Sequence, residues 1–126
     1  MKDRELAFFV DDDPEFLEMI SYLVQHPHFE VQTFYSQNGY QVIDEIIRTK
    51  PDVLFIDFNL PRANGIQIVS ILRSVEALAK VRVYFVTGYP REQILPLLND
   101  IDSGKVLQKG PTLKEDILKI LESEAA

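Results

Sequence analysis

The chain has 126 residues, enough for one domain with a hydrophobic core of its own. Its formal net charge of −7 argues against nucleic acid as a direct partner, because phosphate backbones require a basic face. It contains no cysteine, which excludes disulfides and thiol chemistry. The N-terminus is too charged, and its apolar run too short, for a signal peptide or a membrane span. We therefore expect a soluble, cytoplasmic protein with no membrane partner.

Short apolar runs alternate with segments of helical periodicity in the first half of the chain. The predicted elements are a strand at 6–10, a helix from 14 to about 26, a strand at 29–34, a helix at 37–50 and a strand at 53–56. Asp13 is a suitable N-cap for the first helix, and Pro14 suits its first turn. The strand at 29–34 alternates in polarity and is expected at a sheet edge, whereas the strand at 53–56 is fully apolar and therefore central.

The second half repeats this order. The predicted elements are a helix from 66 to about 79, a strand at 81–86, a helix from 90, a strand at 105–108 and a closing helix from about 113. Pro96 should shorten or kink the helix that begins at 90, because proline has no N–H to donate. Five β–α units in succession predict an α/β fold, with one parallel sheet and helices on both of its faces.

Polar residues stand where four of the five predicted strands end. Asp11 and Asp12 follow the first strand, Asp57 the third, Thr87 the fourth and Lys109 the fifth. Ligands of open α/β sheets bind beyond the carboxyl ends of the strands, so we expect these groups to share one pocket. Crowded carboxylates are costly to bury, and an all-oxygen site with a divalent cation, Mg²⁺ above all, offsets that cost. In this pocket Asp57 can act as a nucleophile, and Lys109 suits phosphoryl oxygens.

Taken together, the segments around these residues resemble the receiver domain of two-component response regulators. The segments that carry the resemblance are FVDDDP at 9–14, PDVLFIDFNLP at 51–61 with Gly65 after it, FVTG at 85–88 and VLQK at 106–109. The resemblance covers the whole chain and implies a single receiver domain over residues 1–126. It further implies a doubly wound, flavodoxin-like (βα)₅ fold with strand order 2-1-3-4-5.

The resemblance assigns roles to the acidic residues. Asp57 would accept a phosphoryl group from the phosphohistidine of a sensor histidine kinase or phosphotransfer protein. Asp12 would coordinate Mg²⁺ (or Mn²⁺) directly and Asp11 mainly through water, with Asp57 and the backbone carbonyl of Asn59 as further ligands. The protein would have no enzymatic activity beyond its own phosphorylation.

The remaining site residues would hold the phosphoryl group and transmit its presence. Thr87 would hydrogen-bond the phosphoryl group, Lys109 would pair with Asp57 or the phosphoryl oxygens, and Gly88 would leave room beside Thr87. Output would run through a protein partner, either a downstream target or a second copy of the chain, on the face made by residues 90–122.

Two positions depart from the family pattern. The family usually has an aromatic residue three positions before the lysine, where this chain has Val106, so the usual movement of a ring cannot transmit the signal. Tyr84 and Tyr89 are the aromatic candidates to replace it. The family also commonly has a cis proline directly after the lysine, whereas here Gly110 precedes Pro111, so any cis bond would lie between these two residues.

Other classes of protein share parts of the pattern. A phosphatase of the haloacid-dehalogenase type also starts with Asp-x-Asp, here Asp11 and Asp13, but requires an acidic pair after its lysine. A flavodoxin-like FMN carrier requires a phosphate loop where this chain has three aspartates, which would repel the phosphate. A pseudo-receiver, which acts as an interaction module without phosphorylation, stays open because Val106 and Gly110 depart from the pattern.

Overall fold

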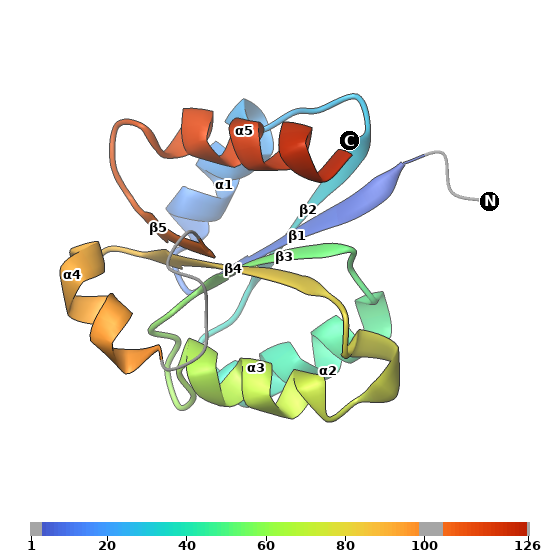
Figure 1. Ribbon diagram of the computed structural model, residues 1–126, viewed down its shortest axis with the longest axis vertical. Helices are drawn as coiled ribbons and strands as arrows, with labels where there is room; N and C mark the ends of the chain where they lie inside the picture. Colours follow the sequence, from blue (N-terminus) through green and yellow to red (C-terminus); the bar gives the residue numbers. More distant parts are fainter. Residues whose placement is uncertain (1–3, 99–104, 126) are drawn as a thin grey trace.

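The protein forms one parallel sheet of five strands, as predicted (Figure 1). This computed structural model describes residues 4–98 and 105–125. The strands are β1 (Glu5–Asp11), β2 (Phe29–Tyr35), β3 (Val53–Asp57), β4 (Arg82–Thr87) and β5 (Val106–Gln108). Their order is β2-β1-β3-β4-β5, so the half-exposed β2 lies at an edge and the apolar β3 at the centre. Both placements, and the 2-1-3-4-5 order, confirm the prediction.

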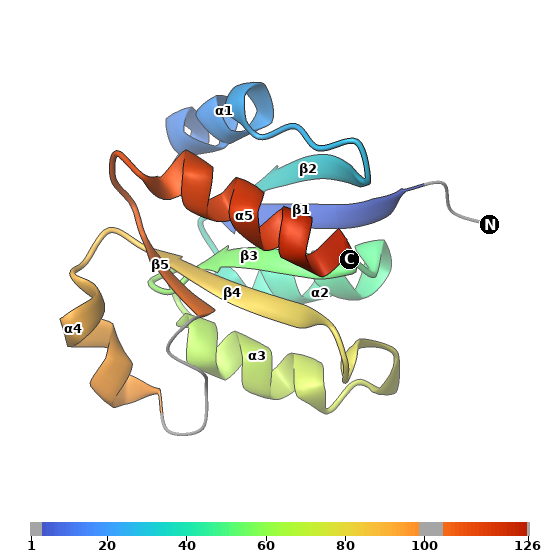
Figure 2. The ribbon, with the colours of Figure 1, turned by 45° about the horizontal axis from the view of Figure 1, so that its top comes forward.

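Helices cover both faces of the sheet. They are α1 (Pro14–Leu23), α2 (Gly39–Thr49), α3 (Gly65–Arg73), α4 (Arg91–Ile94) and α5 (Leu113–Ala125), with short 3₁₀ turns η1 (Glu76–Leu78) and η2 (Leu95–Leu97). Figure 1 shows α1 and α5 on one face and α2 and α3 on the other. In Figure 2, α4 lies beside the end of the sheet that β5 forms. None of the described helices is long and apolar enough to cross a membrane.

Successive residues of the central strands point to opposite faces of the sheet and pack in two separate hydrophobic cores. On the α1–α5 face the rings of Phe9, Phe55 and Tyr84 stack in a row, with centroids 4.4 Å and 5.3 Å apart. On the α2–α3 face Phe8 and Leu54 belong to the larger cluster. Each fully buried apolar side chain contributes about 1.5–3 kcal/mol relative to an exposed one, so both faces hold the sheet rigid. The rigid sheet in turn fixes where its strand ends lie.

Two helices end earlier than their apolar periodicity predicts. The first ends at Leu23, not near residues 26–27, because Val24 adopts an extended backbone and is itself buried. The third ends at Arg73, not near residue 79. There the Ser74 hydroxyl donates back to the Ile71 carbonyl, an alternative to the helical ladder, and the 3₁₀ turn η1 follows. The periodic apolar residues continue past both ends because they still face the core.

Pro96 shortens the fourth helix, as predicted. Only Arg91–Ile94 is α-helical, and a 3₁₀ turn follows at Leu95–Leu97. Since proline cannot donate to the ladder, the chain leaves the α-helical path there. Ile94 and Leu98 are the buried residues of this segment. The result is a short helix with few anchors in the core.

Gly65 lies where the loop after β3 enters α3, and its backbone is pressed against the core. A Cβ at this position would lie 2.5 Å from Cε1 and 2.8 Å from Cδ1 of the Phe85 ring, which is fully buried. We therefore expect Gly65→Ala to lower the free energy of unfolding by about 1–3 kcal/mol, as overpacking does. Thermal unfolding measures this, with Gly110→Ala as the control, because a Cβ at Gly110 meets nothing within 4 Å. Equal stability of the two variants would contradict the close packing at Gly65.

Candidate functional site

The carboxyl ends of β1 and β3 bring three carboxylates together. Phe9 pairs with Phe55 and Val10 with Ile56, so Asp11 and Asp57 come at the same level of the sheet. Asp11 is 1% exposed and Asp57 7% exposed, while Asp12 is half-buried. One oxygen from each of the three lies within 4.8 Å of the others. The structure thus collects the aspartates that the sequence predicts in one pocket.

Lys109 places its ammonium among these carboxylates. Its Nζ lies 2.9 Å from Oδ2 of Asp11 and 3.3 Å from Oδ2 of Asp57. The contact with Asp57 is a hydrogen bond, whereas the angles at Asp11 do not suit one. Oδ2 of Asp11 is therefore a buried oxygen with a counter-charge beside it but no directed donor. The lysine was expected beside Asp57, and its closer approach to Asp11 is an additional feature.

Burial and the neighbouring charges shift the pKa values of Asp11 and Lys109. Burial is the main cause that raises the pKa of Asp11 from its usual 3.8 to about 6, and the charge of Asp57 acts in the same direction. Lys109 partly offsets this shift. Burial by itself would lower the pKa of Lys109, but the two carboxylates outweigh it and the net shift is upward. The pocket therefore keeps its lysine charged while the buried Asp11 resists ionisation.

The donor set fits a small divalent cation. All the candidate ligands are carboxylate oxygens, which Mg²⁺ prefers, and Oδ2 of Asp11 has no hydrogen bond to lose. Mg²⁺ binds oxygens at about 2.0–2.1 Å, so the three oxygens, now within 4.8 Å of one another, would draw closer around the ion by rotation of their side chains. A bound cation would also favour the ionised form of Asp11, against the burial that raises its pKa.

Thr87 and Asn59 line the pocket from neighbouring segments. Thr87 is fully buried, and its Oγ1 accepts a hydrogen bond of 3.0 Å from the Tyr89 N–H. The Asn59 N–H donates to Oδ1 of Asp57 at 2.9 Å, which orients that carboxylate. Gly88 is exposed, and a Cβ there would meet no atom within 4 Å, so the space beside Thr87 is open.

Phe16 also belongs to the pocket, although its spacing suggests only a core residue of α1. Its ring lies beneath Lys109, with Nζ 4.3 Å from the ring centroid. A cation over an aromatic face gains about 0.5–1 kcal/mol at an exposed site, so the ring helps to hold the ammonium in place. Asp13 starts this helix as predicted and accepts from the N–H groups of Glu15 and Phe16. The N-cap therefore also positions Phe16.

The two departures from the family pattern have structural outcomes. Val106 is 2% exposed and packs in the α2–α3 core. Tyr84 faces the opposite core, where its hydroxyl donates to Oε1 of Glu124 at 2.7 Å, and Tyr89 is exposed. Neither tyrosine therefore takes the place of the missing ring in this structure. The peptide bond between Gly110 and Pro111 is trans, as are the other peptide bonds of the described residues.

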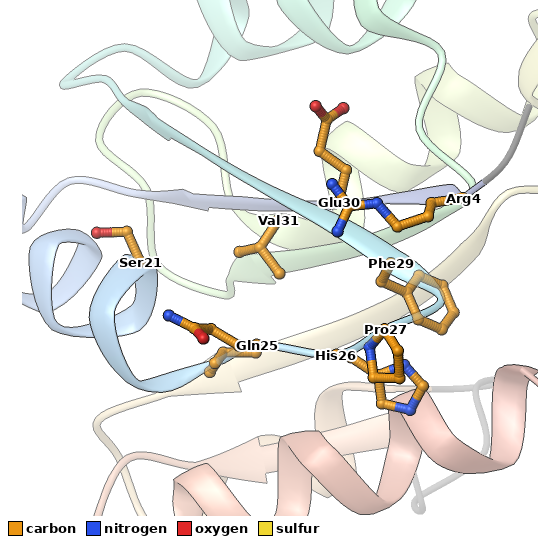
Figure 3. Close-up of a pocket in the computed structure, with 9 residues that line it drawn as sticks. Arg4, Ser21, Gln25, His26, Pro27, Phe29, Glu30 and Val31 are labelled. Atoms are coloured by element: carbon orange, nitrogen blue, oxygen red, sulfur yellow. The ribbon is translucent and has the colours of Figure 1, made fainter.

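A separate pocket of about 510 Å³ lies at the amino ends of the strands, between the end of α1 and the start of β2 (Figure 3). His26 lines it, and both ring nitrogens of this residue are engaged. Its Nε2 lies 2.7 Å from Oε2 of Glu122, and its Nδ1 accepts from the His28 N–H at 3.1 Å. No cluster of three metal-ligating side chains occurs here among the described residues. The predicted site residues lie at the other end of the sheet.

The five-stranded order and the acidic pocket at the carboxyl ends define a doubly wound α/β protein with a cluster of carboxylates at one edge of its sheet. Residues 7–122 match the response regulator receiver domain family, so the chain belongs to that family.

Among curated proteins the chain is 28% identical over 127 residues to protein-glutamate methylesterase/protein-glutamine glutaminase 5 of Geobacter metallireducens, covering 98% of this chain and 34% of that protein. It is 25% identical over 128 residues to the nitrate/nitrite response regulator protein NarL of Escherichia coli K12, covering 100% of this chain and 58% of that protein. The chain spans about a third of the length of the first curated relatives that it matches.

Solved structures show the same fold at lower sequence identity. The chemotaxis response regulator CheY4 of Vibrio cholerae superimposes with a TM-score of 0.73 at 23% identity, covering 95% of this chain and 98% of that one. The signal receiver domain of the putative response regulator NarL from Mycobacterium tuberculosis gives a TM-score of 0.76 at 22% identity, covering 98% of each chain.

The three carboxylates around one ammonium leave the metal-free pocket with an excess of negative charge. Asp57→Asn should therefore raise the metal-free free energy of unfolding, by about 1 kcal/mol, because the amide keeps the shape and the acceptor for Asn59 but removes one charge. Chemical denaturation in the presence of a chelator measures this. Asp13→Asn is the control, since asparagine caps a helix as well as aspartate and Asp13 lies outside the cluster. A less stable Asp57→Asn protein would contradict the crowded pocket.

Proposed function

We propose that the chain is a phospho-accepting receiver domain, spanning residues 1–126, in which Asp57 takes a phosphoryl group from a phosphohistidine. The observation that carries this proposal is the position of the Lys109 ammonium, 2.9 Å from Asp11 and 3.3 Å from Asp57. A carboxylate attacks an anionic phosphoryl donor poorly unless positive charge offsets the repulsion. This pocket supplies that charge at the nucleophile itself.

Each residue of the pocket has a separate role in the proposed phosphoryl transfer. An oxygen of Asp57 forms the new bond to phosphorus while the bond from phosphorus to the donor nitrogen breaks, and the nitrogen keeps the electron pair. The Asn59 N–H and the Lys109 ammonium hold the Asp57 carboxylate in position. The Thr87 hydroxyl would donate a hydrogen bond to the transferred phosphoryl group. The open space at Gly88 leaves room for the molecule that carries the phosphoryl group. Transfer of this kind depends on positioning and charge more than on covalent help from the protein.

A divalent cation completes the charge balance. The carboxylates of Asp11, Asp12 and Asp57, with the carbonyl of Asn59, would hold Mg²⁺ or Mn²⁺. When bound, the cation supplies positive charge for the phosphoryl oxygens. The buried Oδ2 of Asp11, which lacks a hydrogen-bond donor, supports this assignment.

The proposed partners follow from family membership. The donor would be a sensor histidine kinase or a phosphotransfer protein of the cytoplasm. The output would be contact with a downstream protein or a second copy through the face of residues 90–122, of which residues 99–104 lie outside the described part. The match to the Geobacter methylesterase covers only 34% of that protein. Its methylesterase activity is therefore not carried over to this chain, and transfer to Asp57 is the one activity proposed.

A pseudo-receiver is the second candidate, and the buried valine at position 106 favours it, because a phosphorylated receiver of the usual kind moves a ring there. The two candidates share the fold and differ in whether Asp57 is ever modified. Chemical phosphorylation therefore separates them.

Incubation with acetyl phosphate and Mg²⁺ should add one phosphoryl group, about 80 Da, to the wild-type protein at Asp57, because the carboxylate is oriented and its charge offset. Intact mass followed by site mapping measures this. Asp57→Asn should gain nothing, and Asp12→Ala should lose both the activity and its dependence on metal. Asp13→Asn should react like the wild type, since Asp13 only caps α1. A wild-type protein that gains no mass at saturating acetyl phosphate and Mg²⁺ establishes the pseudo-receiver.

A further inference from the structure

Arg91 connects the short helix α4 to the edge strand β5. Its Nε donates to the carbonyl of Val106 at 3.0 Å, and its backbone N–H lies 3.4 Å from Oε1 of Gln108. Both acceptors belong to the strand that ends just before Lys109. Arg91 therefore fastens the start of α4 to the strand that carries the lysine of the acidic pocket.

The other end of this connection reaches the pocket through Thr87. The Thr87 carbonyl accepts the Lys109 N–H at 2.7 Å, and its hydroxyl accepts the Tyr89 N–H at 3.0 Å. Tyr89 is only two residues before Arg91. Hydrogen bonds at Thr87 and at Arg91, joined by the backbone of residues 88–90, thus connect the pocket to the α4–β5 contact.

Among the described residues, three apolar side chains of the α4 segment pack on the core, Leu95 only partly buried. Pro96 ends its ladder, and Ile94 and Leu98 are the buried side chains of the segment. A pocket of about 380 Å³ opens beside it, lined by Arg91, Val106, Leu107, Gln108, Thr112 and Asp116. In Figure 2 this helix projects away from the main body, next to β5. The Arg91 contacts with β5 therefore contribute to positioning α4.

We propose that Arg91 is the positioning residue through which modification of Asp57 moves α4, in the place of the aromatic ring that this chain lacks. The inference rests on the proposed phosphorylation of Asp57. Turning the Thr87 hydroxyl toward a phosphoryl group leaves the Tyr89 N–H without its acceptor. The loop at 88–90 then rearranges, and Arg91 leaves the Val106 carbonyl. Val106 itself stays in the core, since its side chain has no polar group to respond.

The Arg91–Val106 hydrogen bond couples the position of α4 to the modification of Asp57, because it differs between the unmodified and the modified protein. The Arg91 to Val106 hydrogen bond exists in the unmodified state and is lost in the modified one. Coupling of this kind is reciprocal, so weakening the unmodified state favours modification. Arg91→Ala should therefore bind beryllofluoride, a phosphoryl mimic, about 2- to 10-fold more tightly in Mg²⁺, the factor that corresponds to one net hydrogen bond.

Two measurements on wild type, Arg91→Ala, Arg91→Lys and Gln93→Ala test the proposal. Titration with beryllofluoride in Mg²⁺ gives the affinity, and hydrogen exchange over residues 91–98 gives the freedom of α4 with and without the mimic. Wild type should exchange faster in this segment when the mimic is bound, whereas Arg91→Ala should exchange fast in both states. Arg91→Lys, which keeps a donor, should lie between them. Gln93→Ala, an exposed position on the same helix, should match the wild type.

The outcomes separate this inference from the proposed function. If Arg91→Ala merely loosens α4, its exchange rises but its affinity for beryllofluoride equals that of the wild type, and the proposal is overturned. A wild-type response that persists in full in Arg91→Ala overturns it as well. If the wild type binds no beryllofluoride and gains no phosphoryl mass, the proposed function fails first and the coupling fails with it.

Discussion

The placement of one ammonium among buried carboxylates is the interaction on which the site depends. Lys109 reaches both Asp11 and Asp57, and its own pKa is raised by them although burial acts in the opposite direction. Without this charge the backbone N–H groups of Asp13 and Asn59 would be the described donors to Asp11 and Asp57, and no positive charge would offset the repulsion between the two buried carboxylates. With it, the pocket is stable enough to fold and still negative enough to attract a divalent cation. The charge distribution that the proposed phosphoryl transfer would use therefore also stabilises the folded pocket.

The sheet explains how residues so far apart in sequence meet with such small separations. Parallel strands in the order β2-β1-β3-β4-β5 place the ends of β1 and β3 side by side, and the two buried cores keep them rigid. Asp11 and Asp57 consequently need no long side chain to approach each other. The longer Lys109 arrives from the edge strand β5, and the Phe16 ring holds it from the side of α1. Stability is concentrated in the sheet, whereas the short α4 has few anchors and is the part best suited to respond.

The strands and their polar ends are predictable because the relevant signals are local. A run of four or five apolar residues followed by an acid is visible without knowledge of the fold, and Pro96 interrupts a helix wherever the helix lies. The ends of α1 and α3 were predicted too far along the chain, because the apolar residues after Leu23 and Arg73 continue to face the core in a non-helical backbone. Periodicity alone does not distinguish these cases.

Other features of the site depend on contacts between distant segments and left no local signal. The ring of Phe16 under Lys109 joins residues that are 93 positions apart, and the Arg91 contact with Val106 spans a loop whose course the sequence does not reveal. Aromatic and arginine residues on helices are ordinarily packing or solvated residues, so neither drew attention on its own. The strand order that the resemblance implies predicts which strand ends meet, but it does not predict which side chains reach across them.

The most direct test of the account is the affinity for Mg²⁺, measured by calorimetry in wild type and Lys109→Ala. The ammonium and the cation compete for the same carboxylates, so removing the lysine charge should tighten Mg²⁺ binding, by roughly tenfold. Lys105→Ala is the matched control, because the Lys105 ammonium lies over the Tyr84 ring and not among the three clustered carboxylates, so its removal should not affect the metal. Mg²⁺ binding that is unchanged or weaker in Lys109→Ala would contradict the claim that one pocket holds the lysine, the aspartates and the metal.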